Sequence, residues 1–263
     1  MPETLLLFTT STAAVLSLGF FLGLKHATEA DHLAAVSTIV SERKSLLSSA
    51  IVGGFWGLGH TISLFIAGIL VLLLNFQISE KTEQTLELCV GVMLVLLGLN
   101  VIRKIIKGGT LHFHTHEHGE HAHVHPHVHK KGHEDAPETH HGFSFNPRAV
   151  LIGMVHGLAG SAALMLIVIP TIQSTLMGLL YIIIFGIGSI GGMMIMSFLV
   201  GLPFHLTASR LNRFNFILQC VAGLISIGLG LFIIYEKGVV EGLFVKDSFS
   251  NFTFNIPNML LVS

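Results

Sequence analysis

The chain is dominated by long apolar stretches, each of which is long enough to cross a lipid bilayer as a helix. A hydrocarbon core of about 30 Å needs roughly 20 mostly apolar residues in helical conformation. Six such stretches lie at 9–38, 46–74, 86–106, 148–170, 174–201 and 214–235. Only 11% of the residues are charged, against about 25% in soluble domains, and the alternating strands of a membrane barrel are absent from the pattern. The sequence therefore predicts an all-α polytopic membrane bundle of six transmembrane helices.

Basic residues are distributed unevenly between the two sides of such a bundle. Six spans place the connections 41–45, 104–147 and 202–213 on one side and both termini on the other. Most Lys and Arg residues belong to the first side and its helix ends, namely Arg43, Lys44, Arg103, Lys104, Lys107, Lys130, Lys131, Arg148, Arg210 and Arg213. The second side has Lys81, Lys237 and Lys246. The positive-inside rule then predicts a multi-pass protein of the cytoplasmic (inner) membrane with both termini outside.

Three segments of the first half recur in the second half, in the same order and about 130 residues later. GLKH (23–26) resembles GMVH (153–156), WGLGHT (56–61) resembles FGIGSI (185–190), and LCVGVMLVLLGL (88–99) resembles CVAGLISIGLGL (220–231). Each half holds three predicted spans, so the second copy runs upside-down relative to the first. Such inverted repeats are common in secondary transporters, with the substrate site where the halves meet. The alternative is convergence of glycine-rich helix-packing faces.

The repeat divides the chain into four predicted parts. Residues 1–106 form the first three-helix repeat and 148–235 the second. Residues 107–147 form a cytoplasmic histidine-rich loop, and 236–263 form an extracytoplasmic tail. Cys89 and Cys220 lie inside apolar segments, so we interpret them as small buried hydrophobic residues rather than a disulfide.

Ionisable residues interrupt the apolar pattern at membrane depth, where each costs at least about 2.5–3.5 kcal/mol and indicates a functional site. The first span contains the pattern H-x4-D-H, and two further histidines follow in GLGHT and GMVHG. Imidazole and carboxylate together suit Ni, Co, Zn, Cu or Fe. We therefore predict one metal site shared by the two halves, with the ligands His26, Asp31, His32, His60 and His156. The alternative is that the first of these are polar helix-end residues beside a snorkelling Lys25.

Helical geometry restricts how the first-span residues can share an ion. At about 100° per residue, His26, Glu29 and His32 lie on one side of a helix while Asp31 points away from them. Either the helix is broken near Gly23–Ala27, or Asp31 faces another helix and contacts a ligand histidine without binding the ion itself. Direct ligation by Asp31 is the favoured interpretation, and Glu29 is a candidate secondary metal or proton site.

Histidines are concentrated in the connection between the third and fourth predicted spans. The segment is polar, with too few packing residues for a core of its own, so we expect disorder without metal. Its composition indicates binding of divalent metal ions, with a solvated or pH-responsive linker as the alternative. The candidate ligands are His112, His114, His116, His118, His121, His123, His125, His127, His129, His133, His140 and His141.

The segments LGLKHATEADHLAAV and WGLGHTISL resemble the signature segments of the nickel/cobalt transporters, the NiCoT and NicO group. Within that group the resemblance is to the branch of urease-accessory membrane proteins, and it covers residues 15–235. It implies that His26, Asp31, His32 and His60 are needed for transport, and that a metallochaperone or urease or hydrogenase maturation proteins are partners. The chain departs from the group in having Glu29 within HATEADH, six predicted spans instead of eight, and HGLAGSA in place of an acidic motif.

These features predict a secondary transporter of Ni²⁺ or Co²⁺, with Zn²⁺ as a further cargo, no permanently bound cofactor and no enzymatic activity. A phosphate-binding G-x4-G-K-[ST] loop is absent from the sequence, as is a basic, aromatic-interleaved patch for nucleic acid. The membrane potential favours uptake of a dication. The alternative direction is proton-coupled efflux of Ni, Co or Zn, for which titrating histidines are suited. More remote alternatives are a metal-binding chaperone or sensor, and a membrane metalloenzyme.

Overall fold

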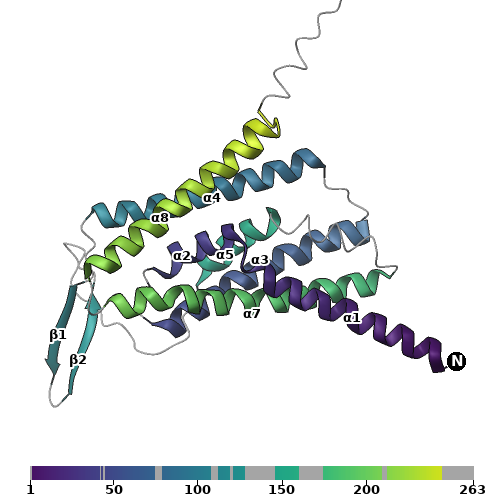
Figure 1. The fold of residues 1–263 in the computed structure, drawn as a ribbon, viewed down its shortest axis with the longest axis horizontal. Helices are drawn as coiled ribbons and strands as arrows, with labels where there is room; N and C mark the ends of the chain where they lie inside the picture. The colour runs from purple at the N-terminus through teal and green to yellow at the C-terminus, as the bar shows by residue number, and fades with distance from the viewer. Residues whose placement is uncertain are drawn as a thin grey trace, which may run out of the picture.

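A computed structural model describes residues 2–41, 43, 45–74, 79–107, 112–118, 121–127, 146–159, 174–208 and 212–244. The protein is a helical bundle (Figure 1), as the apolar pattern predicts. Its helices are α1 (Pro2–His26), α2 (Ala30–Val40), α3 (Leu46–Leu74), α4 (Glu80–Ile106), α5 (Pro147–Ala159), α7 (Thr175–Ala208) and α8 (Asn212–Tyr235). A π-helical turn, η2 (Glu236–Val240), follows α8.

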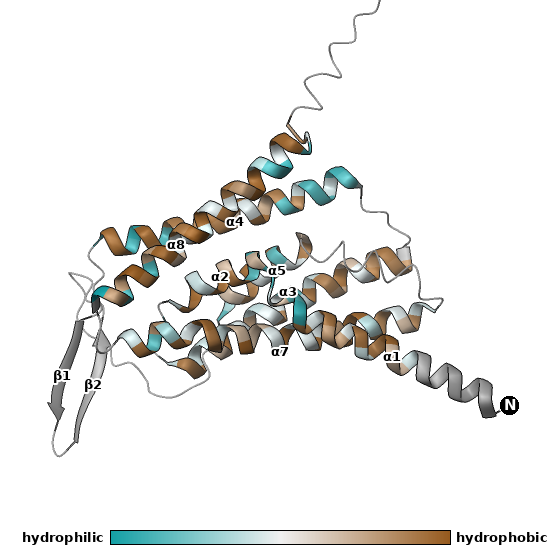
Figure 2. Ribbon diagram, in the orientation of Figure 1, coloured by the Kyte–Doolittle hydropathy of each residue, from teal (hydrophilic) through white to brown (hydrophobic). Residues whose placement is uncertain are grey.

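Many large hydrophobic residues are exposed on the outside of the bundle, as expected for a surface that faces lipid. Figure 2 shows that hydrophobic residues make up much of the long helices. Among the described residues, α3, α4, α7 and α8 are long and apolar enough to cross a membrane. Shorter apolar helices cover Thr12–His26, Ala30–Val40 and Pro147–Ala159. The protein is therefore a multi-pass membrane protein. Of the predicted fourth span, residues 160–170 lie outside the described part of the chain.

The predicted continuous span 9–38 is wrong in one respect, because the chain breaks into α1 and α2 at residues 27–29. The Thr28 hydroxyl donates to the Lys25 carbonyl at 2.6 Å, which satisfies an acceptor at the end of α1. Glu29 is extended, with φ −65° and ψ 151°, so α2 starts on a new axis. Asp31 lies in the first turn of α2 and accepts the His32 backbone N–H at 2.8 Å. A carboxylate there is stabilised by the helix dipole.

The helices form two groups in Figure 1. Helices α4 and α8 lie side by side along one flank, while α3 packs against α5 and α7, and α1 packs along α7. The short helices α2 and α5 lie between these groups. The hairpin described below lies at one end of the bundle, and η2 and the start of α1 lie towards the other end.

Close helix contacts occur in matching pairs between the two halves. A Cβ on Gly23 of α1 would overlap the Phe185 carbonyl of α7, and a Cβ on Gly153 of α5 would overlap the Trp56 carbonyl of α3. The two contacts are related by the shift of about 130 residues seen in the sequence. Glycine is required at both positions because only a residue without a side chain lets the two backbones approach this closely.

Helices α4 and α8 also contact each other through glycines at matching positions of the two halves. The Gly91 and Gly230 backbones are in contact, and so are those of Gly98 and Gly223. In the sequence alignment Gly91 corresponds to Gly223 and Gly98 to Gly230, so each contact exchanges the equivalent positions of the two segments. This reciprocal pattern is that of a two-fold related contact.

The histidine-rich loop contains a two-stranded antiparallel hairpin, β1 (His112–His118) with β2 (His121–His127), paired from His112↔His127 to His118↔His121. The composition predicts disorder without metal, whereas this part of the loop is described as paired strands. The candidate ligands His129, His133, His140 and His141 lie outside the described residues, as does most of the predicted tail, 245–263. Metal binding by the loop stays a prediction.

Candidate metal centre

All five predicted ligands meet in one place inside the bundle. His26 at the end of α1 and His60 of α3 approach with their Nε2 atoms 3.2 Å apart. His32 Nδ1 lies 3.0 Å from Asp31 Oδ1 and 3.2 Å from Nε2 of His156, on α5. His156 Nε2 is also 3.1 Å from Asp31 Oδ2. The four histidines are at most 1% exposed, so they form a closed polar cluster within an apolar bundle.

The cluster contains two overlapping sets of three potential ligands. One set is His26, His32 and His60, and the other is Asp31, His32 and His156. Within each set the ligand atoms lie within 4.8 Å of one another. Metal–nitrogen bonds of about 2.0–2.1 Å place neighbouring ligand atoms roughly 3.0–3.4 Å apart, which matches the contacts between these side chains. Each set is therefore a candidate site for a transition-metal ion.

Asp31 reaches the cluster because the helix breaks. Of the two alternatives left by the helical angles, the break is the one observed, at residues 27–29. The new axis of α2 directs the Asp31 carboxylate to His156, 125 positions away in sequence. Asp31 thus contacts two histidines, and its direct ligation of an ion stays a prediction. Glu29 lies in the break, with its carboxylate 3.0 Å from His26 Nδ1 but out of line for a hydrogen bond.

Each of the four histidines carries a buried ring nitrogen without a hydrogen-bond partner. Leaving a buried polar atom unpaired costs about 1–3 kcal/mol, so four in one cluster are unusual for a centre built only for stability. The atoms are His26 Nδ1, His32 Nε2, His60 Nδ1 and His156 Nδ1.

Close backbone packing holds the cluster together. A Cβ on Gly157 would overlap the His60 backbone, so α3 and α5 touch next to the histidine that each contributes. The Ser63 hydroxyl donates to the Met154 carbonyl at 2.7 Å and ties the same two helices one turn further along. Both contacts fix the position of His156 relative to His60.

Trp56 belongs to the centre and was not among the predicted site residues. It is 1% exposed, its indole Nε1 has no hydrogen-bond partner, and its ring lies 5.3 Å from His32 and 5.5 Å from His156. A signal was present in the sequence, because WGLGHT places this single tryptophan four residues before His60, on the same face of α3. Ser189, the predicted counterpart of His60, is also buried and its hydroxyl is unpartnered.

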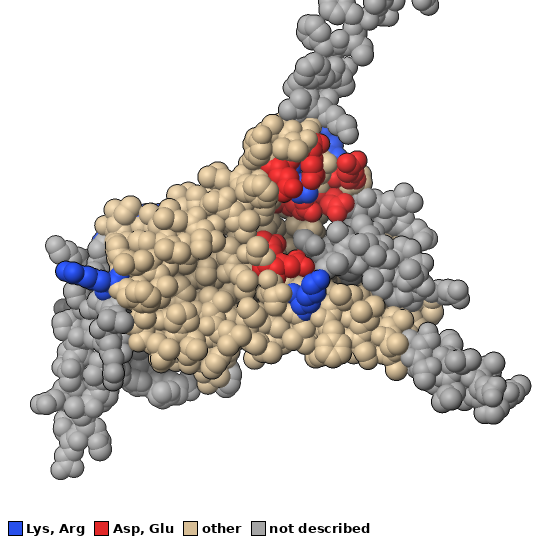
Figure 3. Space-filling model, viewed as in Figure 1, with Lys and Arg blue, Asp and Glu red and all other residues tan. Residues whose placement is uncertain are grey.

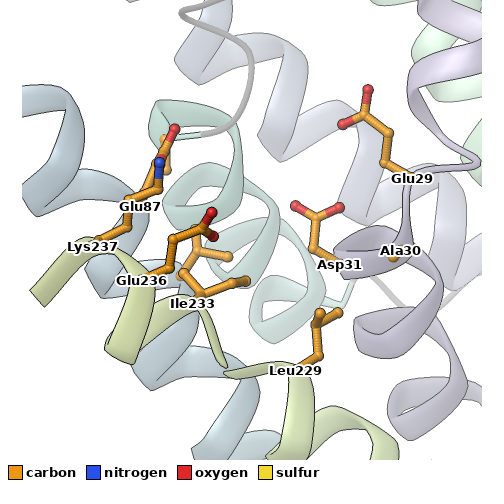
Figure 4. Close-up of a pocket in the computed structure, with 10 residues that line it drawn as sticks. Glu29, Ala30, Asp31, Glu87, Leu229, Ile233, Glu236 and Lys237 are labelled. Atoms are coloured by element: carbon orange, nitrogen blue, oxygen red, sulfur yellow. The ribbon is translucent and has the colours of Figure 1, made fainter. Parts of the chain in front are cut away.

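A pocket of about 310 Å³ leads to Asp31 from the surface of the bundle. Glu29 and Asp31 lie on one side of it and Glu87, Glu236 and Lys237 on the other (Figure 4). Figure 3 shows acidic side chains gathered on this face of the molecule, both at the end of the α4–α8 pair and in the hollow below it. Four carboxylates and one ammonium group give the lining a net negative charge, which attracts cations.

Lys237 is the counter-ion of the pocket. Its Nζ lies 2.7 Å from Glu87 Oε2 of α4 and 2.5 Å from Glu241 Oε1. The residue is in η2, and π-helical turns are frequent at functional sites. Nothing in the sequence pattern connects these charges with Asp31, because Glu87 is on α4 and Lys237 and Glu241 follow α8, all far from Asp31 along the chain.

Comparison with known proteins identifies the family. The chain is 41% identical over 232 residues to the urease accessory protein UreH of Bacillus sp. (strain TB-90), covering 88% of this chain and 95% of the relative. The chain belongs to the UreH family. This confirms the resemblance to the urease-accessory branch of the nickel/cobalt transporter group. The family model of the cytochrome c biogenesis protein transmembrane region matches residues 34–232, a range that includes His60 and His156 and starts just after His32.

Two chloroplast proteins of Arabidopsis thaliana are also similar to this UreH-family chain. They are named FOR GROWTH AND FERTILITY 2 and FOR GROWTH AND FERTILITY 1, and each is 28% identical, over 83% and 82% of this chain. The chain spans 55% and 57% of their lengths. No solved structure matches the chain. None of the three relatives bears the name of an enzyme.

Proposed function

We propose that the protein is a secondary transporter that carries Ni²⁺ or Co²⁺ across the cytoplasmic membrane, with Zn²⁺ as a further cargo. The observation that carries the proposal is the cluster of four buried histidines and Asp31 inside a membrane bundle. Ionisable groups at this depth mark ion pathways, and imidazole with carboxylate suits these metals. The relationship to a protein named as a urease accessory protein supports a nickel-related role.

The proposed architecture is a pair of inverted three-helix repeats with six membrane crossings. The matching contacts of Gly23 with Phe185 and Gly153 with Trp56 support it, as do the reciprocal glycine contacts of α4 with α8. His26, Asp31, His32 and His60 come from the first half and His156 from the second, so the centre lies between the halves. Rocking of one half against the other opens the centre to each side in turn.

The membrane potential supplies the driving force in this proposal. A potential of 100 mV is worth about 2.3 kcal/mol per charge, so a dication gains about 4.6 kcal/mol on inward movement. That energy supports accumulation by more than about a thousandfold. Uptake therefore needs no further coupling. The histidine loop is placed on the cytoplasmic side, where it receives ions for a metallochaperone or for urease or hydrogenase maturation proteins.

Flux into sealed proteoliposomes tests this function. Purified protein is reconstituted, an inside-negative potential is imposed, and radiolabelled Ni²⁺ or Co²⁺ inside the vesicles is counted. We expect uptake above that of protein-free vesicles, and slower uptake when the potential is reversed. Flux that responds to an imposed pH gradient and not to the potential would instead show proton exchange and favour efflux.

Deleting the histidine loop is expected to leave most of the flux intact. The two ligand sets found among the described residues are drawn from His26, Asp31, His32, His60 and His156, so removal of this segment should change the initial rate by no more than about threefold. The measurement is Ni²⁺ uptake by the shortened chain in the same vesicles. Loss of uptake to the level of empty vesicles would indicate a protein that acts through its loop, as a metal-binding chaperone does.

Charge changes in the pocket are expected to alter uptake in opposite directions. Glu236→Gln removes a negative charge and should lower the initial rate at low ion concentration and low salt by about threefold to tenfold. Lys237→Gln removes the ammonium group and should raise the same rate. Glu83→Gln is a matched control on α4, one turn before Glu87 and outside the pocket lining. Changes of the same sign in both variants would contradict an electrostatic role.

A further inference from the structure

His32 lies between the two sets of ligands and belongs to both. Its Nδ1 is the atom near Asp31 and His156, at 3.0 Å and 3.2 Å. Its Nε2 is buried and has no hydrogen-bond partner. The His26 ring packs 4.4 Å from the His32 ring, and the His60 ring lies 5.3 Å from it. The His32 ring thus lies next to the other members of both sets.

The two sets differ in access. Every member of the set His26, His32 and His60 is fully buried. The set Asp31, His32 and His156 includes a carboxylate whose side chain is 22% exposed and which lines the acidic pocket. We call this second set the outer set and the first one the inner set. An ion that arrives through the pocket therefore meets the outer set first.

The sets also differ in charge and in origin. The outer set has a carboxylate and joins α2 to α5 of the second half, whereas the inner set consists of three imidazoles from α1, α2 and α3 of the first half. A dication is therefore held more tightly by the outer set, since a carboxylate offsets part of its charge. Two dications held by sets that share one side chain would repel each other strongly in a protein interior, so the sets are filled one at a time.

We propose that the centre holds a single ion at two successive positions bridged by His32, where the sequence predicts one shared site. The ion binds the outer set from the acidic pocket and then moves to the inner set, with His32 as the ligand common to both positions. Bonds to Asp31 and His156 are exchanged for bonds to His26 and His60, without any change of oxidation state. This inference rests on the proposed function and states the order in which the transported ion meets the two ligand sets.

Binding of Co²⁺ to the purified full-length protein tests the two positions, because the absorption spectrum of Co²⁺ reports its ligands. His32→Ala keeps the histidine loop and loses both sets, so it gives the baseline for loop-bound ions. Above that baseline, wild type is expected to bind one Co²⁺. His60→Ala and His156→Ala are each expected still to bind one, with spectra that differ from each other, and each should lose at least about a hundredfold in flux.

Several results would overturn the inference. They are two Co²⁺ ions bound at once by wild type, loss of the buried Co²⁺ in either single variant, or identical spectra in both. His60→Gln and His156→Gln keep side-chain volume and are measured alongside, and Ser189→Ala is the control for a buried polar change outside both sets. Absence of flux in wild type would reject the proposed transport, whereas binding by the variants decides the two positions.

Discussion

Replacing His32 by alanine is expected to lower Ni²⁺ or Co²⁺ flux more than any other single change in the protein. His32 is the residue common to both ligand sets and is 0% exposed. Loss of a residue that merely supports a ligand costs about 10–100-fold in metal affinity or activity, so loss of a shared ligand should reduce flux by at least roughly a hundredfold. The measurement is the initial rate of uptake into proteoliposomes at equal protein content.

The matched control for this prediction is His205→Ala. His205 is an exposed histidine on α7, outside both ligand sets. The His205→Ala variant also removes a histidine side chain from an apolar helix, and we expect its uptake to be within about twofold of wild type. Equal uptake by the His32→Ala protein and the control would show that the ion does not pass through the buried histidines.

Replacing Gly153 by alanine is expected to destabilise the bundle strongly. The added Cβ would overlap the carbonyl group of Trp56, and backbone atoms cannot move aside as a flexible side chain can. Overpacking typically costs about 1–3 kcal/mol, occasionally more, and this contact also sets the approach of α5, and with it His156, to α3. We expect a lower Tm in detergent and reduced Co²⁺ binding.

Two further glycines make this prediction specific. A Cβ on Gly228 of α8 meets nothing within 4 Å, so Gly228→Ala should keep or slightly raise stability, by at most about 1 kcal/mol. Gly23→Ala introduces the equivalent overlap with Phe185 in the other half and should cost about as much as Gly153→Ala. A Gly153→Ala protein as stable as Gly228→Ala would contradict the packing at the interface of the halves.

The helical bundle could be predicted from the sequence because apolar stretches of this length have few other folds in a membrane. The division of the first stretch was harder to predict. Helical angles show that His26 and Asp31 cannot both face one ion on a regular helix, but they do not show which residue ends the helix. The hydroxyl of Thr28 and the extended backbone of Glu29 decide this.

The convergence of His26, His60 and His156 was predictable from the repeated motifs, and His32 was predicted from the H-x4-D-H pattern. Their division into two sets was not, because spacing along a helix does not show which side chains of different helices come within ligand distance of one another. The acidic pocket was also missed. Glu87 and Glu236 are distant in sequence from Asp31 and lie near it only through the packing of α4 and α8 against the rest of the bundle.

The steady-state accumulation of Ni²⁺ in proteoliposomes, measured against the imposed potential, tests the central claim most directly. For a dication carried through the buried centre, the ratio of inside to outside concentration should rise about tenfold for each additional 30 mV, inside negative. Over the same period, vesicles with the His32→Ala protein should accumulate no more Ni²⁺ than protein-free vesicles. Wild-type accumulation that does not change with potential, or that equals the accumulation by His32→Ala vesicles, would contradict the account.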